Sequence, residues 1–394
     1  MPTPARNTLA IVGAGPVGLE AAAAALEHGF DVHVFERGEV GAHPLAWGHV
    51  RLFTPWSANV GPASARLLAR HGWTTPPAGE RPTGAELVER VLAPLAATPE
   101  LKPRVHEHSQ VVHVARQATL KGERAGEAAR AGRPFRLLVR DAGGRESVLR
   151  AFAVIDASGT YGSPNWAGSG GIPARGELYL APQMSYHCDD VRGLRRARYA
   201  GKRTLVIGGG ATACTTVLEL AQLAAEVPGT TITWVTRGTG PFAGEVEHDA
   251  ANDAANDGAR ATLASRAGLF AAAHALREGG DPVLTWVGAA EVEGFEYNSA
   301  THRYRVALEA DGKARLEEAE QVIVNAGYRA DLAICRELDV HEHGTALVCA
   351  EPGFHVVGAK SHGRDRGFLP AIGWAQVESA MGALSARLAG PAGA

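Results

Sequence analysis

The sequence predicts an α/β fold built from two βαβ modules, with the second module inserted into the first. Two segments that begin at Leu9 and Thr204, about 195 residues apart, read alike: apolar strand, glycine-rich turn, helix, then a strand rich in β-branched residues. Strand and helix patterns also close the chain, at 354–357 and 370–388. If this closing pair returns to the first module, the chain forms two Rossmann-like dinucleotide-binding domains, one interrupted by the other.

The first module carries a glycine fingerprint directly after its first strand. In Gly13-Ala-Gly15-Pro-Val-Gly18, the first glycine permits a tight turn, the second lets backbone approach a pyrophosphate, and the third lets helix pack against strand. The helix that follows runs to about Glu27, and its N-terminus offers N–H groups and a positive dipole end to phosphates. Glu36 closes the next strand, 31–36, where a carboxylate would accept hydrogen bonds from a ribose diol.

The region between the modules is expected to be mixed. Thr83 and Glu86 form a capping-box pattern that predicts a helix to about Ala97. Three strands are expected, at 110–116, 135–140 and 151–156. The stretch 121–133, rich in Gly, Ala, Arg and Glu, is expected to be an exposed hairpin excursion.

The second module repeats the fingerprint as Gly208-Gly-Gly210-Ala-Thr-Ala213, with alanine in the third position, which the motif tolerates. Its helix runs to about Ala225 and its second strand covers 230–236. No carboxylate follows that strand. Arg237 stands there instead, and a guanidinium pairs bidentately with a 2′-phosphate. The module therefore favours NADPH over NADH, the alternative being that Arg237 is only solvated surface.

A helix at about 249–278 and further strands follow the second module. These strands are expected at 283–287, 303–309 and 321–325. The resulting domains are residues 1–195 with 318–394 for the first and 196–317 for the inserted second.

Composition and charge exclude several classes of function. The formal net charge is −3 and no basic stripe is visible, so we expect no nucleic-acid partner. The longest uncharged apolar run, 21–26, is too short to span a bilayer, and no signal peptide is recognisable. We therefore expect a cytoplasmic protein without a membrane partner.

Cysteines and histidines do not predict a metal site or a redox dithiol. The four cysteines form no CxxC pair: Cys188, Cys214, Cys335 and Cys349. Cys214 falls in the first turns of a helix, where a small buried residue is expected. Two His-x-His pairs lack the further ligands that a metal needs and are interpreted as strand or loop surface: His106 with His108, and His341 with His343.

Two further short segments, together with the fingerprints, resemble the motifs of a known family. Asp156-Ala-Ser-Gly159 and Asn325-Ala-Gly327-Tyr-Arg-Ala-Asp331 each follow a buried strand, and with the two fingerprints they resemble the flavin-containing monooxygenase superfamily of two-dinucleotide-domain flavoproteins. The resemblance covers almost the whole chain. It implies FAD on the first domain, NADPH on the second, and a flavin C4a-(hydro)peroxide, formed with O2, that oxygenates a small molecule.

Some local phrases resemble a bacterial subgroup, the arsenic-operon flavin monooxygenases. They are 47–56, 170–173 and 358–364. The chain departs from the family pattern in two places. Met184-Ser-Tyr-His-Cys188 only partly matches the usual stretch before the second fingerprint, and Arg329-Ala-Asp331 replaces Arg-Pro-Asp. These departures leave subfamily and substrate open.

Three residues are predicted to act in chemistry: His187, Arg51 and His362. His187 lies just before the second module, where clefts between domains form, and its alternative is an inert side chain. The segment Arg51–Trp56 and the start of the last helix, 368–371, are predicted to meet the flavin ring, because a helix N-terminus stabilises an anionic reduced ring. The alternative for the helix start is simple core packing, and both can hold.

We predict that the cofactors contact the two fingerprints, the strand ends beside them and the late glycine turn. The predicted cofactor-binding residues are Gly13, Gly15, Pro16, Gly18, Glu36, Arg37, Arg51, Val112, Ala157, Gly159, Gly208, Gly210, Ala213, Arg237, Ala326, Gly327, Gly358 and Leu369.

The sequence leaves three functions to compare. The leading prediction is an NADPH-dependent FAD monooxygenase whose partners are a small-molecule substrate and O2. The second is an NAD(P)H-dependent flavoprotein reductase or electron-transfer enzyme without a redox disulfide. The third is a flavin-binding regulator or redox sensor, because one fold hosts many chemistries. Sulfur, nitrogen, carbonyl and arsenic(III) centres all remain open as substrates, and so does a homodimer.

Overall fold

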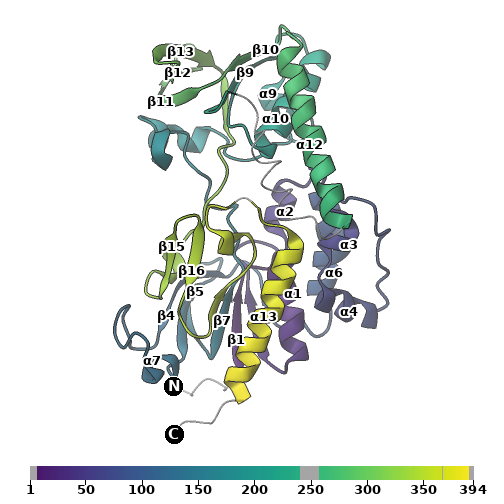
Figure 1. Cartoon of the computed structure of the whole chain (residues 1–394), viewed down its shortest axis with the longest axis vertical. Coiled ribbons are helices and arrows are strands. Elements are labelled where there is room, and N and C mark those ends of the chain that lie inside the picture. The colour runs from purple at the N-terminus through teal and green to yellow at the C-terminus, as the bar shows by residue number, and fades with distance from the viewer. Residues whose placement is uncertain (1–6, 240–256, 366, 390–394) are drawn as a thin grey trace. The chain divides into compact units, whose positions relative to one another are not determined.

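The computed structural model describes residues 7–239, 257–365 and 367–389. The chain forms two compact units, the first made of residues 1–163 and 329–394 and the second of residues 164–328 (Figure 1). Each unit contains one parallel sheet and one three-stranded antiparallel sheet. This is the predicted α/β architecture of two Rossmann-like domains.

The first unit is built on a five-stranded parallel sheet in the order β17-β7-β1-β2-β3. Its strands are β1 (Thr8–Val12), β2 (Asp31–Phe35), β3 (Val105–His106), β7 (Ala153–Asp156) and β17 (Phe354–Val356). The closing strand β17 pairs with β7, and the closing helix α13 (Pro370–Ala389) packs against α1 (Pro16–Glu27). The predicted return of the chain to the first module is therefore confirmed.

Alternation along β1 gives the parallel sheet two buried faces. Leu9 and Ile11 join a core with α1, α13 and α4 (Pro62–Arg70), whereas Ala10 and Val12 join a core with the antiparallel sheet. Residues 21–25 of α1 are all alanine and all buried. Their small side chains let neighbouring helices approach α1 closely.

The antiparallel sheet of the first unit contains β4 (Gln110–Arg116), β5 (Phe135–Arg140) and β6 (Glu146–Ala151). A hairpin of β15 (Val340–His343) and β16 (Ala346–Cys349) and the short turn η4 (Ala333–Cys335) accompany it. Expected strands 110–116 and 135–140 have the predicted bounds, and 151–156 shortens to β7 because Phe152 separates it from β6.

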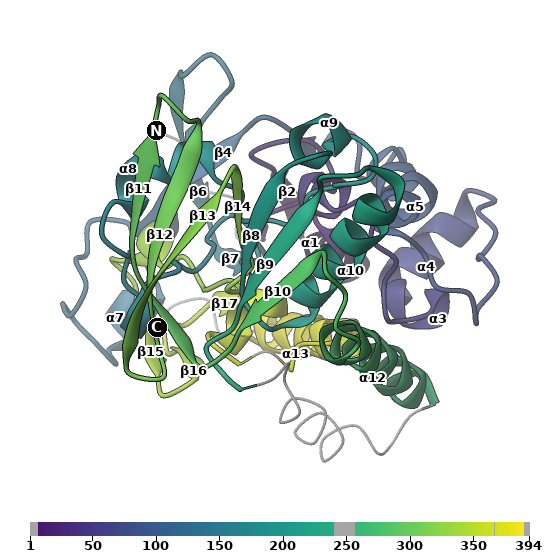
Figure 2. The same cartoon turned by 90° about the horizontal axis from the view of Figure 1, so that it is seen from above.

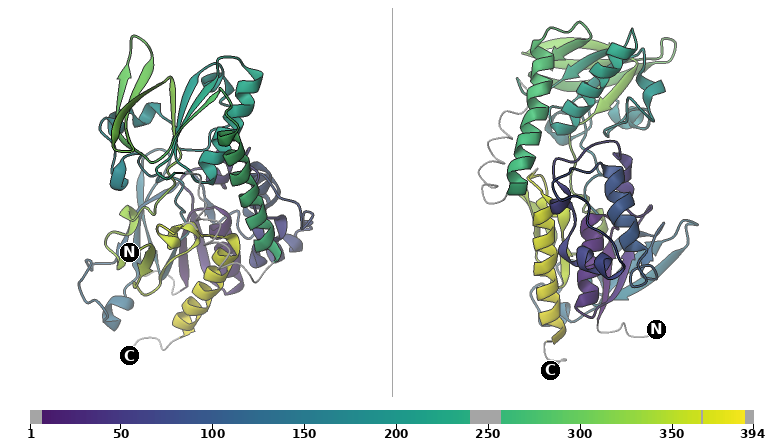
Figure 3. Two further views of the ribbon diagram at one scale, coloured as in Figure 1. Left: turned by 45° about the horizontal axis from the view of Figure 1, so that its top comes forward. Right: turned by 90° about the vertical axis from the view of Figure 1, so that its right-hand side faces the viewer.

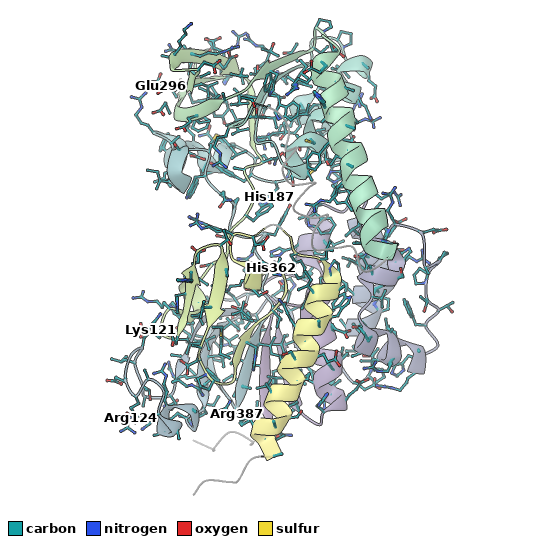
Figure 4. The ribbon with its side chains drawn as sticks, in the orientation of Figure 1. Lys121, Arg124, His187, Glu296, His362 and Arg387 are labelled. Atoms are coloured by element: carbon teal, nitrogen blue, oxygen red, sulfur yellow. The ribbon has the colours of Figure 1, made fainter. Side chains whose placement is uncertain are left out.

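The excursion between β4 and β5 is not merely an exposed hairpin, as the sequence predicted. Lys121 and Arg124 do lie on its exposed surface (Figure 4). The short helix α7 (Ala128–Ala131), however, carries Arg130 into the interior, where its guanidinium pairs with the buried Glu351 at 2.7 Å. The prediction was wrong on this point because a buried partner more than two hundred residues away holds the arginine inside.

The segment between β2 and β3 is helical. It contains α2 (Ala42–Ala46), α3 (Trp56–Asn59), α4, α5 (Gly84–Leu87), a π-helical turn η1 (Val88–Leu92) and α6 (Ala93–Ala96). The predicted capping box is confirmed, since Thr83 Oγ1 accepts from Glu86 N–H and Glu86 accepts from Thr83 N–H. The predicted helix to about Ala97 is thus present, interrupted by the π turn.

The second unit has a four-stranded parallel sheet in the order β10-β9-β8-β14. Its elements are β8 (Arg203–Ile207), α10 (Ala211–Glu226), β9 (Thr231–Val235), α12 (Asp257–Glu278), β10 (Leu284–Val287) and β14 (Gln321–Val324). Figures 2 and 3 show α10 and the long α12 beside this sheet. The predicted start of α12 near Asp249 lies outside the described residues.

A second antiparallel sheet covers the other face of the parallel sheet in this unit. It consists of β11 (Ala290–Asn298), β12 (Arg303–Ala310) and β13 (Lys313–Ala319) (Figure 2). Leu205 and Ile207 of β8 pack toward it, whereas Val206 packs toward α10. Period-two alternation therefore assigns each face of β8 to one layer.

The unit borders differ from those expected near 195 and 318. The second unit already includes residues 164–195, with η2 (Ser169–Gly171), α8 (Glu177–Leu180) and η3 (Ala181–Gln183). Leu180 and Met184 join the same core as Leu205, and Ser185 pairs with Ile323 of β14. These short elements lack the periodicity that would have assigned them from sequence. The helix α9 (Arg196–Tyr199) follows them.

Candidate functional site: two glycine cradles

The first glycine-rich turn, Gly13–Gly18, lies at the carboxyl end of β1, where the chain turns into α1. We call this turn, together with the strand ends beside it, the first cradle. Gly13 adopts φ +99°, and its N–H donates to the carbonyl of Phe35 at 2.8 Å. A Cβ on Gly13 would come within 2.8 Å of the Ala157 carbonyl, and one on Gly18 within 2.0 Å of the Gly13 carbonyl. These two glycines are therefore required by the protein's own packing.

Gly15 differs from the other two glycines. It is the N-cap of α1 at φ −81°, a conformation open to any residue, and a Cβ there would meet no protein atom within 4 Å. Pro16 occupies the first turn of α1, where its missing N–H leaves no bond unmade. The first turn of α1 thus presents open space and a positive helix end in one place, which suits a phosphate group.

Glu36 is held beside this turn by backbone donors. Its Oε2 accepts from Ala14 N–H at 2.9 Å and its Oε1 from Gly38 N–H at 2.8 Å. Each carboxylate oxygen keeps a lone pair for a further donor such as a ribose hydroxyl. The neighbouring Arg37 has its guanidinium near Gly162, since a Cβ on Gly162 would lie 3.0 Å from Nη2.

His43 is a residue that the sequence analysis missed. It lies on α2, its ring is 5.2 Å from that of Tyr161, and burial lowers its pKa although the Glu36 charge opposes this. A lone histidine gives no sequence signal, so only the structure places it beside Glu36 and Arg37.

The remaining parts of the first cradle come from the ends of β7 and β17. Ala157 N–H donates to the Val12 carbonyl at 2.9 Å, and Gly159 follows at φ +68°. Gly358 begins the turn η5 (Gly358–His362) at φ +75°, and a Cβ on it would lie 3.4 Å from Val17 of α1. Gly13, Gly18, Ala157 and Gly358 therefore converge on the start of α1.

Four other predicted residues of the first unit lie outside this turn. Arg51 is exposed, and its guanidinium donates to the Arg81 carbonyl and lies 3.8 Å from Glu86. Val112 is the bulged residue of β4. Leu369 immediately precedes α13, and His362, labelled in Figure 4, lies edge-on to Phe368 at 5.4 Å. The described contacts tie Arg51 to the start of α5.

The second cradle repeats the first in detail. Gly208 adopts φ +131°, its N–H donates to the Val235 carbonyl at 2.9 Å, and a Cβ on it would lie 2.2 Å from the Asn325 carbonyl. Gly210 is the N-cap of α10, and a Cβ there would again meet nothing within 4 Å. Ala213 is fully buried in the position of Gly18. Both fingerprints thus leave one open glycine at a helix N-terminus.

The loop after β9 carries Arg237, which is exposed. Trp286 donates from Nε1 to Thr236 Oγ1 at 3.1 Å, and the guanidinium of Arg277 stacks over the Trp286 ring at 4.5 Å. Arg277 also donates to the Thr239 carbonyl at 3.4 Å. The loop that presents Arg237 is therefore braced from β10 and α12.

His187 lies beside the second cradle, in the loop before α9 (Figure 4). Its ring stacks on Tyr328 with 5.9 Å between centroids, and Nδ1 lies 3.2 Å from the Tyr328 hydroxyl. Asn325 fixes the backbone here, since its Nδ2 donates to the His187 carbonyl and its Oδ1 accepts from Thr216. Ala326 and Gly327, at φ +89°, continue the same turn.

The cysteines are free and mostly buried. Cys214 is fully buried on α10, as expected of a small packing residue. Burial raises the pKa of the Cys188, Cys335 and Cys349 thiols to about 11. Such thiols are poor nucleophiles at neutral pH.

Within the part of the chain that the structure describes, no cluster of His, Cys, Asp or Glu could hold a metal ion, and no helix is long and apolar enough to cross a membrane.

Comparison by sequence identifies the first cradle only. Residues 11–43 match the family model of the NAD(P)-binding Rossmann-like domain. No curated protein matches the chain.

Comparison of structures shows the fold of the whole chain. The bacillithiol disulfide reductase of Bacillus cereus is similar with a TM-score of 0.72 and 16% identity, over 97% of this chain and 99% of that one. The ornithine hydroxylase of Pseudomonas aeruginosa has a TM-score of 0.66 and 16% identity, over 97% and 99%. The ornithine N-hydroxylase of Kutzneria was solved with reduced FAD, NADP+ and L-ornithine. Its TM-score is 0.64 and its sequence identity is 16%, over 96% of this chain and 99% of that one.

These likenesses show the fold, in which one chain forms two Rossmann-like domains. They include two hydroxylases and a disulfide reductase, so they do not distinguish between these activities. They also leave the resemblance to arsenic-operon enzymes as a prediction.

Proposed function

We propose that this chain is an oxidoreductase that binds FAD in the first cradle and NADPH in the second, and that it acts as a monooxygenase on a small molecule. The observation that carries the proposal is the pair of open glycines, Gly15 and Gly210, each at a helix N-terminus and each clear of protein atoms. Two such positions in one chain fit two bound pyrophosphates.

The two cradles differ in the side chain that would bind the adenosine ribose of the cofactor. The first offers the Glu36 carboxylate, which suits the free diol of FAD. The second offers Arg237, which suits the 2′-phosphate of NADPH. In the Kutzneria relative, FAD and NADP+ are bound together in one chain of the same fold.

Bound FAD would supply the redox chemistry, accepting a hydride from NADPH and passing electrons to O2. The chain's own residues would bind, orient and shield. The N-terminal turn of α13 would present backbone N–H groups and a positive helix end toward the flavin, with Leu369 at its border. His187, which stacks on Tyr328, would orient the nicotinamide ring of NADPH. We propose that His362 and Arg51 act beside the flavin ring.

A flavoprotein reductase is the second candidate, and the structural similarity to a bacillithiol disulfide reductase supports it. The buried thiols with raised pKa values speak against electron transfer through a cysteine pair of this chain. A reductase of this kind would pass electrons from flavin directly to an acceptor. We propose a cytoplasmic enzyme whose partners are O2 and a small molecule.

The deciding experiment separates reduction from oxygen chemistry. The FAD-loaded protein is mixed anaerobically with NADPH, oxygen is then admitted, and the flavin spectrum is followed by stopped flow. A transient absorbance distinct from oxidised and reduced flavin, with less than stoichiometric free peroxide when a sulfur, nitrogen, carbonyl or arsenic(III) compound is present, supports the monooxygenase. Direct return to oxidised flavin with full peroxide yield for every candidate moves the assignment to the reductase.

The open glycines give a sharper test of cofactor placement. Gly210→Ala is expected to leave stability unchanged, because its Cβ meets no protein atom and its φ is −78°. It should weaken NADP+ binding about tenfold, since one methyl group would stand where the pyrophosphate approaches. Isothermal titration with NADP+ and thermal unfolding measure the two effects separately.

The matched variant at the first position of the fingerprint behaves differently. Gly208→Ala is expected to destabilise the second unit itself, because Cβ would lie 2.2 Å from the Asn325 carbonyl at φ +131°. A Gly210→Ala protein that melts like Gly208→Ala, or that binds NADP+ normally, would contradict the assignment of the second cradle.

A further inference from the structure

We propose that Lys360 is a positioning residue for FAD, which locks two loops of the first cradle through a buried ion pair with Asp156. The inference rests on the proposed function. The sequence singles out the phrase 358–364 without giving Lys360 any role, and Gly358 of the same turn was predicted to contact the cofactor.

The pair is fully inside the protein. Lys360 Nζ lies 2.7 Å from Asp156 Oδ2, and the two side chains are 1% and 0% exposed. Nζ also donates to Ser158 Oγ at 3.2 Å. Ser158 in turn donates to Asp156 Oδ1 from both N–H, at 3.1 Å, and Oγ, at 2.6 Å. Every polar atom of this group therefore has a partner at bonding distance.

Each end of the ion pair belongs to a loop that forms the cradle wall. Asp156 is the last residue of β7. The backbone of the next two residues, Ala157 and Ser158, is what a Cβ on Gly13 would contact. Lys360 belongs to η5, whose first residue, Gly358, lies against Val17 of α1. The ion pair thus joins the two loops that flank the phosphate-binding turn of α1.

The turn that carries Lys360 is tied to a third element. Gln376 of α13 accepts from Gly358 N–H at 2.8 Å and donates to Ser361 Oγ at 2.8 Å, and Ser361 Oγ donates to the Gly358 carbonyl. Lys360 therefore couples the loop after β7 to the second turn of α13, the helix whose N-terminal end is proposed to face the flavin.

Stability alone does not account for this arrangement. A buried ion pair seldom stabilises a fold more than apolar residues of the same size, because both charges lose their hydration. Its best-attested use is to specify one geometry among several. The position of this pair, between two loops of a proposed cofactor site, indicates what that geometry serves.

The test compares removal of one charge with removal of both. Lys360→Met, Asp156→Asn and the double variant are purified without flavin, and Lys202→Met, in a partly exposed pair with Glu320 of the second unit, serves as the control. Four quantities are measured: the melting temperature of the apoprotein, the dissociation constant for FAD, and the visible circular dichroism and reduction potential of bound FAD.

The two single variants are expected to melt lower, because each leaves one buried charge without its opposite charge, Asp156 in Lys360→Met and Lys360 in Asp156→Asn. The double variant should recover most of the melting temperature yet bind FAD at least tenfold more weakly than the wild type, with an altered dichroism band. Lys202→Met should match the wild type in FAD affinity and dichroism.

Wild-type FAD affinity, dichroism and potential in the double variant would overturn the positioning role and leave the proposed function standing. A wild-type protein that binds no FAD would overturn the proposed function, and the positioning role with it. These outcomes are distinguishable because the first is read from the variants and the second from the wild type.

Discussion

Replacing Glu351 with glutamine is expected to lower the free energy of unfolding of the first unit by about 3–5 kcal/mol. Glu351 is buried between two arginines, with Arg116 Nε 2.7 Å from Oε1 and Arg130 Nη2 2.7 Å from Oε2. The three side chains are 0%, 0% and 4% exposed. Without the carboxylate, two guanidinium groups would stay in the interior with no compensating charge.

The cluster also joins segments that are distant along the chain. Arg116 ends β4, stacks over the Phe135 ring at 3.8 Å and donates to the carbonyls of Arg133 and Pro352. Arg130 anchors the excursion between β4 and β5. Glu351 precedes β17, the strand that returns the chain to the first sheet. Loss of the carboxylate should therefore loosen the excursion and β17 together.

Hydrogen exchange followed by mass spectrometry measures the loss of backbone protection separately for each segment of the chain. Peptides covering β4, α7 and β17 should lose protection in Glu351→Gln, whereas peptides of β8 and β9 should keep it. Glu342→Gln removes one partner of the exposed pair with Arg364 and serves as the control, with an expected cost below about 1 kcal/mol. Equal effects of the two variants would refute the role assigned to the cluster.

The same cluster predicts a dependence on pH. Burial would raise the pKa of Glu351, but the hydrogen bonds from Arg130 and Arg116 outweigh it and hold that pKa below its ordinary value of 4.5. A lowered carboxyl pKa stabilises the fold above the ordinary value, and this contribution is lost as pH falls through the folded-state pKa. The stability gap between wild type and Glu351→Gln should thus be full at pH 7 and shrink below pH 4.5. A gap of constant size down to the acid transition would contradict this assignment.

The sequence was sufficient for most strands of the parallel sheets and for the two glycine-rich turns because both depend on local patterns, whereas the two-residue β3 was too short to be predicted. Apolar strands followed by GxGxxG or GxGxxA turns allow few folds, and the structure places β1, α1, β8 and α10 within a residue or two of the predicted bounds. The return of β17 and α13 to the first unit could also be predicted, since each has a clear period.

The sequence was insufficient where a residue's environment is set by distant partners. Arg130 lies in a polar, glycine-rich stretch, so exposure was the natural expectation, but Glu351 holds it inside. Lys360 was likewise unassigned because its partner, Asp156, precedes it by some two hundred residues. The unit borders shifted for the same reason, as residues 164–186 pack on β8 and β14 without a helical or strand period.

Replacing Arg237 with alanine is expected to reduce the preference for NADPH over NADH about a hundredfold, which corresponds to the loss of two charge-assisted hydrogen bonds to one phosphate. Arg237 is exposed just after the carboxyl end of β9, and the described structure offers no carboxylate at that strand end to bind a 2′-hydroxyl. The effect should appear in kcat/KM for NADPH, with kcat/KM for NADH almost unchanged, because only NADPH carries the 2′-phosphate.

The measurement is the rate of anaerobic flavin reduction at varied concentrations of each nucleotide. Arg303→Ala removes an exposed arginine of the same unit that pairs with Glu318 on β13, and it should leave the preference intact. Raised salt should weaken NADPH binding in the wild type more than in Arg237→Ala, since the exposed phosphate contact is screened. If both nucleotides lose rate equally, Arg237 supports the loop rather than the phosphate. In that case the brace of Trp286 and Arg277 against Thr236 and Thr239 would be the reason that the residue matters.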